Sequence, residues 1–249
     1  MVKWKAAAAL CCVMLMMSST SNASPAAGAK ERKYYETRGE IVWEVPTEEK
    51  VIALTFDDGP SPEDTPEILK LLAEYDAKAT FFIIGKHAER YPDIVKQEVE
   101  AGHELANHTF NHPFFNNRSS LDAMKKEIEQ TEETLTRITG QKPALFRPPG
   151  GYYSDRLIDA AKAFHYQVVL WSWHQDTEDW KRPGVHKIVN KVLRNARNGD
   201  IILFHDFVGG KSQTVSALKQ ILPELKERGF RFVTVSELIG YDQVPHVIQ

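Results

Sequence analysis

Cysteine is almost absent from this sequence. Among its 249 residues there are two, Cys11 and Cys12, both near the beginning of the chain. If this beginning is removed, no thiol remains, which excludes disulfide bonds and thiolate catalysis. Beyond the first two dozen residues, no stretch reaches the ~18 apolar residues that a membrane-spanning helix needs. Positive charge is not in excess, because 34 Asp and Glu stand against 31 Lys and Arg, which argues against a nucleic acid as partner.

Two sequence signatures of hydrolases are also missing. No Gly-x-Ser-x-Gly occurs, which disfavours a serine esterase of the α/β-hydrolase type. The stretch HELANH, residues 103–108, superficially resembles the helix of a zinc protease. That motif needs His-Glu-x-x-His, and this stretch has one residue too many. Catalytic groups must therefore be sought elsewhere in the chain.

The first 23 residues have the pattern of a secretory signal peptide. Lys3 and Lys5 precede an apolar run that begins at Ala6, and small residues then allow cleavage after Ala23. Removal would change the formal net charge from −3 to −5, because two Lys and no acid are lost. The rest of the chain divides into a polar spacer, a single domain and a tail, at residues 24–44, 45–240 and 241–249. We therefore expect a secreted or cell-wall-associated monomer without a membrane span after cleavage.

From Val51 onward, short apolar runs alternate with longer segments of helical periodicity. Repeated strand–helix units of this kind predict a parallel sheet, either open or closed into a barrel. The seven strand candidates lie within residues 51–56, 79–85, 103–109, 144–151, 166–173, 200–206 and 231–238. Helices are predicted over residues 65–76, 91–102, 119–140, 155–165, 184–199 and 213–229.

Polar side chains with catalytic potential directly follow the predicted strands. In an open sheet such residues gather at one switch point, whereas in a barrel every strand contributes to one rim. Because five strands contribute here, we expect a distorted (β/α) barrel of about seven parallel strands in a single α/β domain. The residues concerned are Asp57, Asp58, His108, His112, Arg147, Asp176, Asp179, His205 and Asp206.

The two histidines of NHTFNHP and the acid pair of TFDDGP suggest a metal centre. On a helical turn, imidazoles four residues apart, as His108 and His112 are, face the same way and can share one metal. Two imidazoles and one carboxylate make a three-ligand Zn²⁺ site with an open position for water. One of Asp57 and Asp58 would bind the cation, and the other would be free to take a proton from water. The alternatives are surface or capping histidines and an ordinary Asp-Asp-Gly turn.

Arg147 and His205 supply two further groups of catalytic type. The guanidinium fork of Arg147 can hold a carboxylate bidentately. Its alternative role is a structural salt bridge in a turn. His205 lies near the end of the predicted strand 200–206 and is placed to donate a proton, with Asp179 able to set its tautomer and raise its pKa. The alternative for His205 is a hydrogen-bonded histidine of the core.

Five stretches of the chain, in this order, resemble the five motifs of the NodB-homology polysaccharide deacetylases, carbohydrate esterase family 4. They are TFDDGP, HTFNHP, RPPGG, DTEDW and ILFHD, and the resemblance extends from Val51 to Leu238. It implies a distorted (β/α) barrel that removes acetyl groups from N-acetylated, or in some members O-acetylated, sugars of polysaccharides. It also implies one divalent metal, with Zn²⁺ favoured over Co²⁺, Ni²⁺ and Mn²⁺.

The same resemblance implies roles for individual residues. Asp57 would be the base that deprotonates a metal-bound water, with Arg147 orienting it. His205 would be the general acid, tuned by Asp179. The implied metal ligands are Asp58, His108 and His112, and the implied substrate-binding residues are Gly150, Tyr152, Trp180, Ile202 and Phe204.

Two stretches depart from the family pattern. The third motif usually carries Tyr where this chain has Gly150. The backbone N–H that would complete an oxyanion pocket survives this change, and Tyr152 or Tyr153 could supply the missing ring. Ile202 and Phe204 stand where Leu residues are usual, which would alter the volume of the acetate pocket.

The expected substrate is β-1,4-linked N-acetylglucosamine in peptidoglycan or in chitin oligomers. An O-acetyl xylan esterase on the same scaffold is the main alternative. A glycosidase with two carboxylates at the barrel rim would leave the histidine pair and Arg147 without roles. A catalytically inactive carbohydrate-binding protein is disfavoured, because every implied ligand and proton carrier is present.

Overall fold

The computed structural model of the protein describes residues 30–210 and 212–242. The predicted signal peptide, residues 1–23, and most of the predicted tail lie outside the described residues. Among the residues that are described, none of the helices combines the length and apolar character that a membrane crossing requires.

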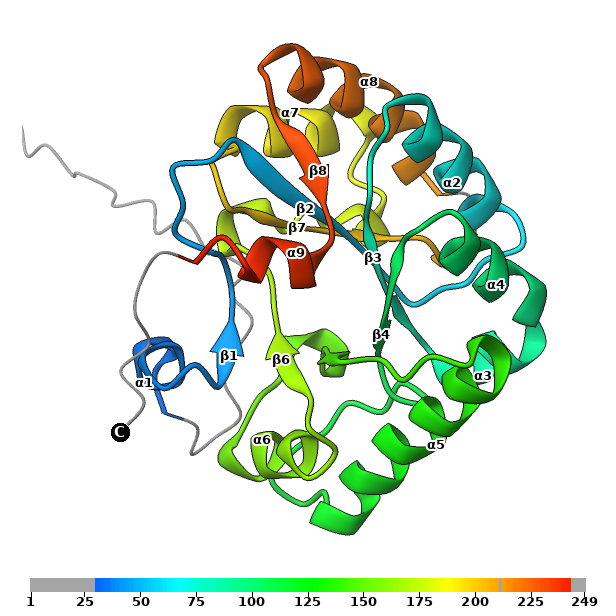
Figure 1. The fold of residues 1–249 in the computed structure, drawn as a ribbon, viewed down its shortest axis with the longest axis vertical. Helices are drawn as coiled ribbons and strands as arrows, with labels where there is room; N and C mark the ends of the chain where they lie inside the picture. Colours follow the sequence, from blue (N-terminus) through cyan, green and yellow to red (C-terminus); the bar gives the residue numbers. More distant parts are fainter. Residues whose placement is uncertain (1–29, 211, 243–249) are drawn as a thin grey trace, which may run out of the picture.

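A curled sheet of eight strands, paired in parallel, forms the centre of the fold (Figure 1). The strands follow the order β1-β6-β5-β4-β3-β2-β7, and β8 also pairs with β2. Each of the seven predicted strands is present, whereas β1 was not predicted. The bounds are β1 Ile41–Val42, β2 Val51–Asp57, β3 Thr80–Ile83, β4 Glu104–Asn107, β5 Leu145–Phe146, β6 Gln167–Val169, β7 Ile201–His205 and β8 Arg231–Val233.

Backbone contacts join the two ends of this sheet. The N–H of Ser172, just after β6, donates to the carbonyl of Ile201 in β7 at 3.0 Å. Further along the same segment, Asp176 forms a parallel bridge with Leu203. The chain after β6 therefore lies against β7 and closes the sheet into a distorted barrel, which confirms the predicted fold class.

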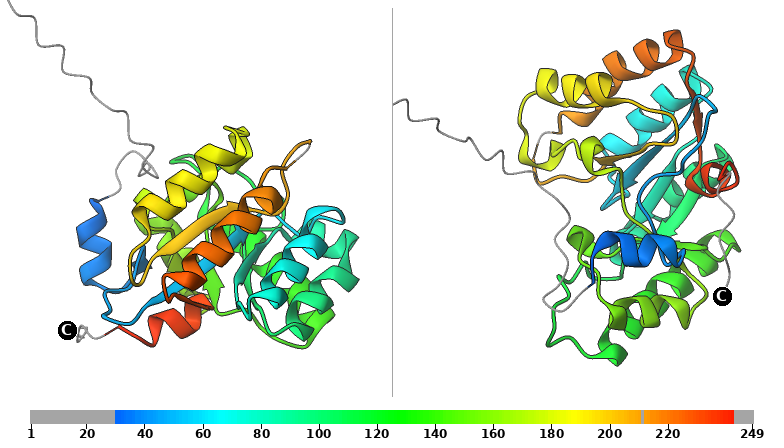
Figure 2. Two further views of the ribbon diagram at one scale, coloured as in Figure 1. Left: turned by 90° about the horizontal axis from the view of Figure 1, so that it is seen from above. Right: turned by 90° about the vertical axis from the view of Figure 1, so that its left-hand side faces the viewer.

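Helices cover the outside of the barrel. Figure 1 and the right-hand view of Figure 2 show α7 and α8 at one end of the molecule and α5 and α6 at the other. All six predicted helices are present, and α3, α1 and α9 are additional. The bounds are α1 Arg32–Thr37, α2 Asp64–Glu74, α3 Gly85–Arg90, α4 Pro92–Glu100, α5 Leu121–Thr139, α6 Asp155–Lys162, α7 Val185–Asn195, α8 Thr214–Glu227 and α9 Val235–Ile239. Short 3₁₀ turns are η1 Pro149–Gly151, η2 Trp173–Gln175 and η3 Asp179–Lys181.

Local signals explain where two of these helices begin. The hydroxyl of Ser120 accepts a hydrogen bond from the N–H of Ala123, which caps α5. The predicted final strand over residues 231–238 is shorter than expected. Thr234 ends it, because its side chain accepts from the N–H of Glu237 and starts α9 instead.

The strands are buried on both faces, as parallel strands covered by helices are. Side chains alternate along a strand, and in β2, β3, β7 and β8 they divide between two apolar clusters. In β2, Leu54 and Phe56 face the cluster that includes residues of α2, α7 and α8, whereas Ala53 belongs to the other cluster, which includes residues of α5 and α6. Thr55 and Asp57 share the face of Ala53. The alternation thus places the carboxylate of Asp57 inside the barrel.

The predicted spacer, residues 24–44, is wrong in its second half. Tyr35 of α1 is fully buried. The centroids of its ring and the Tyr153 ring lie 5.2 Å apart in an edge-on contact, and its hydroxyl donates to Oδ1 of Asp155 at 2.8 Å. Trp43 is also buried, and β1 pairs with β6. The segment is polar on average, but the buried side chains of Tyr35, Ile41 and Trp43 attach it to the domain. At the other end, Tyr241 of the predicted tail packs against the core.

Candidate active site and metal centre

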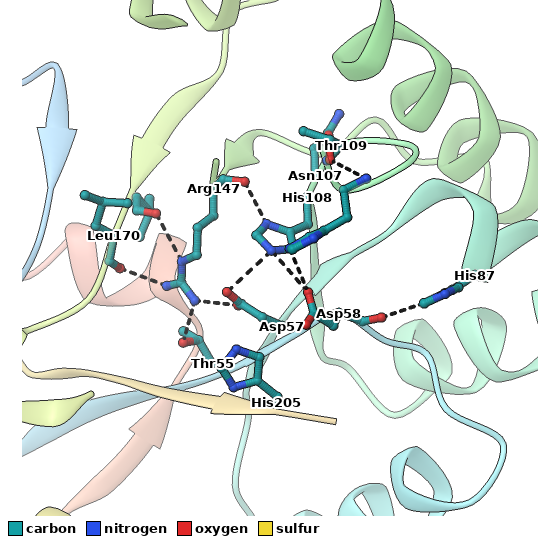
Figure 3. Close-up of polar contacts among 12 residues, drawn as sticks. Thr55, Asp57, Asp58, His87, Asn107, His108, Thr109, Arg147, Leu170 and His205 are labelled. Carbon is teal, nitrogen blue, oxygen red and sulfur yellow. Dashed lines mark hydrogen bonds and ion pairs between the residues drawn. The ribbon is translucent and has the colours of Figure 1, made fainter. Parts of the chain in front are cut away.

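The predicted catalytic residues meet at the carboxyl ends of the strands. Asp57 is the last residue of β2, His205 is the last residue of β7, and the two are paired in register. His108 follows β4, and Arg147 follows β5. Since parallel strands end at the same rim of a barrel, residues far apart in sequence come together there (Figure 3).

Asp58, His108 and His112 form a group able to hold a metal ion. One ligand atom of each lies within 4.8 Å of the others. Nε2 of His112 is 3.2 Å from Oδ1 of Asp58, and Nε2 of His108 is 3.4 Å from the same oxygen. Nδ1 of His108 must donate to the carbonyl of Arg147, 2.7 Å away, because a carbonyl only accepts. In a neutral ring, this leaves the Nε2 lone pair of His108 directed at the site.

The electrostatics of this group suit a cation. Oδ1 of Asp58 is buried and has no hydrogen-bond partner among the described residues. Burial opposes ionisation of Asp58, but the neighbouring His108 and the charge of His205 outweigh it and lower its pKa. Burial lowers the pKa of His112 to about 4, so this imidazole is neutral at pH 7. One carboxylate and two imidazoles are a ligand set that Zn²⁺ accepts.

The expectation that His108 and His112 share a helical turn is wrong. The chain between them is a loop in which Thr109 and His112 have positive φ angles, 68° and 58°. The N–H of Thr109 donates to Oδ1 of Asn107, and the N–H of His112 donates to the hydroxyl of Thr109. These bonds fold the loop back, and the two imidazole centroids lie 5.0 Å apart. A tight loop thus brings the two rings together.

Arg147 is fully buried and anchors the carboxylate of Asp57. Its Nη1 donates to Oδ1 of Asp57 at 2.6 Å and to the hydroxyl of Thr55 at 2.9 Å. The other donors bind backbone carbonyls at the end of β6: Nη2 bonds Leu170 at 2.8 Å and Nε bonds Val169 at 3.2 Å. The predicted bidentate contact is therefore wrong, because the rest of the fork is engaged by the barrel wall (Figure 3).

Because Arg147 binds Oδ1 of Asp57, the other carboxylate oxygen, Oδ2, is not held by the guanidinium. Its Oδ2 lies 3.7 Å from Nε2 of His108, on the side of the metal group. Asp57 is thus fixed through one oxygen, while the other faces the place where Asp58, His108 and His112 converge.

His205 is held by a buried carboxylate. Its Nδ1 donates to Oδ1 of Asp179 at 2.7 Å, and Oδ2 of Asp179 accepts from the N–H of His205 at 2.8 Å and from the hydroxyl of Thr214 at 2.7 Å. Burial alone would lower the pKa of His205, but the charge of Asp179 outweighs it and raises the pKa to about 10. His205 is therefore protonated at neutral pH and its Nε2–H can be donated.

Three of the predicted substrate-binding residues lie at or near the surface. The side chains of Tyr152 and Trp180 are exposed, and Gly150 lies in η1 with a φ of 64°. Of the two rings that could replace the missing tyrosine, Tyr153 is excluded because it is buried against Tyr35 and Trp43.

The predicted pocket role of Ile202 and Phe204 is wrong. Both are fully buried in the apolar cluster that includes residues of α2, α7 and α8, and the ring of Phe204 stacks on that of Phe56 with their centroids 5.7 Å apart. Because side chains alternate along a strand, residues 202 and 204 point away from the face that carries His205. Leu203 is the β7 residue on the face of His205.

Two residues near the site were not predicted. Phe114 is 63% exposed, and the centroid of its ring lies 5.4 Å from that of His112 in an edge-on contact. His87 lies 2.7 Å through Nδ1 from the carbonyl of Asp58 (Figure 3). Phe114 follows the second motif by one residue, which was a usable signal. Nothing in the sequence around His87 indicated its contact. His174 is not one of these residues: its Nε2 lies 2.9 Å from Oδ1 of Asp200, which is a structural contact.

Comparison with known proteins identifies the family. The model of the polysaccharide deacetylase family matches residues 44–169. The chain belongs to this family of hydrolases. A peptidoglycan-N-acetylglucosamine deacetylase of Bacillus cereus is 52% identical over 210 residues, which cover 84% of this chain and 98% of the relative. The predicted membership of carbohydrate esterase family 4 is thereby confirmed.

Solved structures of other polysaccharide deacetylase family members share the fold. The Bc1960 peptidoglycan N-acetylglucosamine deacetylase gives a TM-score of 0.78 at 36% identity, over 85% of this chain and 97% of the other. A family 4 acetyl xylan esterase from Clostridium thermocellum, solved with a cobalt ion, gives 0.73 at 33% identity, over 79% of this chain and 94% of the other. The distorted barrel is therefore common to members named for different substrates.

Proposed function

We propose that this polysaccharide deacetylase is a secreted, metal-dependent enzyme that hydrolyses the N-acetyl group of β-1,4-linked N-acetylglucosamine in peptidoglycan. The observation that carries the proposal is the convergence of three groups at one rim. These are the ligand set, the Asp57–Arg147 pair and the His205–Asp179 pair. The relative that is 52% identical is named for this substrate, and the predicted signal peptide would place the enzyme where peptidoglycan occurs.

Asp58, His108 and His112 would hold the cation, for which we propose Zn²⁺. When bound, such a cation polarises a carbonyl oxygen and lowers the pKa of water. The unpartnered oxygen of Asp58 and the neutral state of His112 support this assignment. The cobalt ion in the acetyl xylan esterase structure also supports a divalent metal in the family.

The protein's own side chains would move the protons. Asp57 takes a proton from the attacking water through Oδ2, while Arg147 keeps the carboxylate in place through Oδ1. The N–H of Gly150 donates to the oxygen of the acetyl group as negative charge develops on it. Nε2 of His205 then gives its proton to the departing sugar nitrogen, which releases acetate and a free amine. Loss of the base or of the acid is expected to lower the rate about 10²–10⁴-fold.

An O-acetyl xylan esterase remains the second candidate, because one structural neighbour is named for that activity. Both reactions need the same base and the same oxyanion contact. They differ in the leaving group: without a proton the sugar nitrogen would leave as an amide anion, which is far more basic than a sugar alkoxide, so the N-deacetylation depends more on the general acid.

The test is acetate release from peptidoglycan, from N-acetylglucosamine oligomers and from acetylated xylan. The wild-type enzyme and the variant Asp57→Asn would be compared, with Asp93→Asn, on the exposed face of α4, as the matched control. We expect release from the N-acetylated substrates, a loss of about 10²–10⁴-fold in Asp57→Asn and no change in the control. Full activity of Asp57→Asn would refute the assignment of Asp57 as the base. Release from xylan alone would establish the second candidate instead.

A further inference from the structure

Phe114 is exposed beside the metal group although it is a large apolar side chain. Its ring is 63% exposed, whereas its chain neighbour Phe115 is buried in the core. Tyr152 is exposed as well, and exposed aromatic side chains that lie together beside a polar site are typical of a ligand-binding groove. The ring meets His112 edge-on at 5.4 Å and Tyr152 edge-on at 6.4 Å. It therefore stands between a metal ligand and the exposed tyrosine.

Gly150 makes room for this ring. A Cβ atom on Gly150 would come 2.8 Å from Cε1 of Phe114, so the ring would have to shift, and 3.3 Å from Cδ2 of Tyr152, which is a tight contact. With a φ of 64°, the position also disfavours any side chain. The absence of a side chain at residue 150 and the placement of Phe114 are thus complementary. The ring covers the space that a side chain at residue 150 would otherwise fill.

We infer that Phe114, together with Tyr152, forms the wall on which the sugar ring that carries the acetyl group packs. The inference rests on the proposed function and adds a specificity-determining residue to it. The ring of Phe114 lies against Gly150, whose N–H is proposed to bind the acetyl oxygen. The sugar attached to that acetyl group must then lie next to the same ring. The apolar C–H face of an N-acetylhexosamine unit suits an aromatic ring, and burying a ring of this size is a large apolar contribution.

The test separates binding of the sugar from chemistry on the acetyl group. The variants Phe114→Ala, Phe114→Leu and Phe114→Tyr would be assayed on an N-acetylglucosamine pentamer and on p-nitrophenyl acetate, which has an acetyl group but no sugar. We expect Phe114→Ala to raise KM for the pentamer about tenfold, equal to about 1.4 kcal/mol, with kcat little changed. KM for the ester should move much less. Phe114→Leu should be intermediate, and Phe114→Tyr should keep the wild-type KM.

Two measurements guard against a purely structural role. Because Phe114 touches His112, the zinc content of each variant is measured, and it should stay at the wild-type ratio. Tyr34→Ala, an exposed aromatic side chain on α1, is the matched control and should leave KM unchanged. An unchanged KM of Phe114→Ala on the pentamer, an equal rise on both substrates, or loss of zinc would overturn the inference while wild-type deacetylation stands. If the wild-type enzyme released no acetate from any N-acetylated sugar, the proposed function itself would fail.

Discussion

The variant Asp179→Asn tests the proposed role of His205 as the general acid. The change removes a negative charge but keeps an oxygen that can accept the hydrogen bond from Nδ1 of His205. Two charges about 4 Å apart at an effective dielectric of about 20 interact by about 4 kcal/mol, equal to about three pKa units. The pKa of His205, raised to about 10 mainly by this charge against the effect of burial, should therefore fall to about 7.

The sign of the pH effect follows from the role of His205. An acid must be protonated to act, so the wild-type enzyme should keep its kcat/KM until the pH approaches 10. In Asp179→Asn the alkaline limb should move down by about three pH units. The two enzymes should be comparable near pH 6, and the variant should be about a hundredfold slower near pH 9.

The free energy of unfolding should also depend on pH through the raised pKa of His205. A histidine whose pKa is raised by folding stabilises the fold fully below its unfolded pKa of about 6.5, and this contribution is lost as the pH rises through about 10. Asp179→Asn should therefore destabilise the protein more at pH 6 than at pH 10, as measured by urea unfolding.

The assay is the pH profile of acetate release from the N-acetylglucosamine pentamer. Thr214→Val is the matched control, because it removes a hydrogen bond to Asp179 and leaves the carboxylate charge in place. Its alkaline limb should stay with that of the wild type. Coincident alkaline limbs for Asp179→Asn and the wild type would show that His205 is not the proton donor tuned by this acid.

Two other perturbations follow from the site. Chelation by EDTA should abolish activity, and Zn²⁺ or Co²⁺ should restore it. The variant His108→Ala should lower the zinc content well below one per chain, whereas the exposed His186→Ala should not. Stoichiometric zinc in His108→Ala would contradict the ligand set. Arg147→Met should reduce the free energy of unfolding by about 3–5 kcal/mol in urea titrations, because it leaves the carboxylate of Asp57 buried without its cation. Adding Asp57→Asn should recover part of that loss, and no recovery would contradict the electrostatic reason.

The order of strands and helices was predictable because apolar periodicity is strong in a parallel sheet covered by helices. The long helix predicted over residues 119–140 is present over Leu121–Thr139, and the Ser and Gly at the ends of the predicted stretch, Ser120 and Gly140, cap it. The closing of the barrel depends on backbone contacts such as that between Ser172 and Ile201. Such long-range contacts leave no trace in a local pattern, although the distribution of polar residues over five strands indicated the result.

The misplaced residues have physical reasons. The faces of Ile202 and Phe204 follow from the period of two, counted from His205, which places Leu203 on its side. The pairing of His108 with His112 arises from a loop with two positive φ angles, which spacing alone does not reveal. Tyr35 is buried by a partner more than a hundred residues away, so the composition of its own segment was misleading.

Arg147 has a consequence for how such a protein can change over time. The same side chain spans the interior from Thr55 and Asp57 on β2 to the carbonyls beyond β6, so it maintains the width of the barrel as well as the position of a carboxylate. Relatives in which Asp58 or His205 is replaced could lose the proposed activity and still fold. Relatives in which Arg147 is replaced would lose stability of the fold as well. Inactive offshoots of this lineage should therefore retain the arginine long after a ligand has gone.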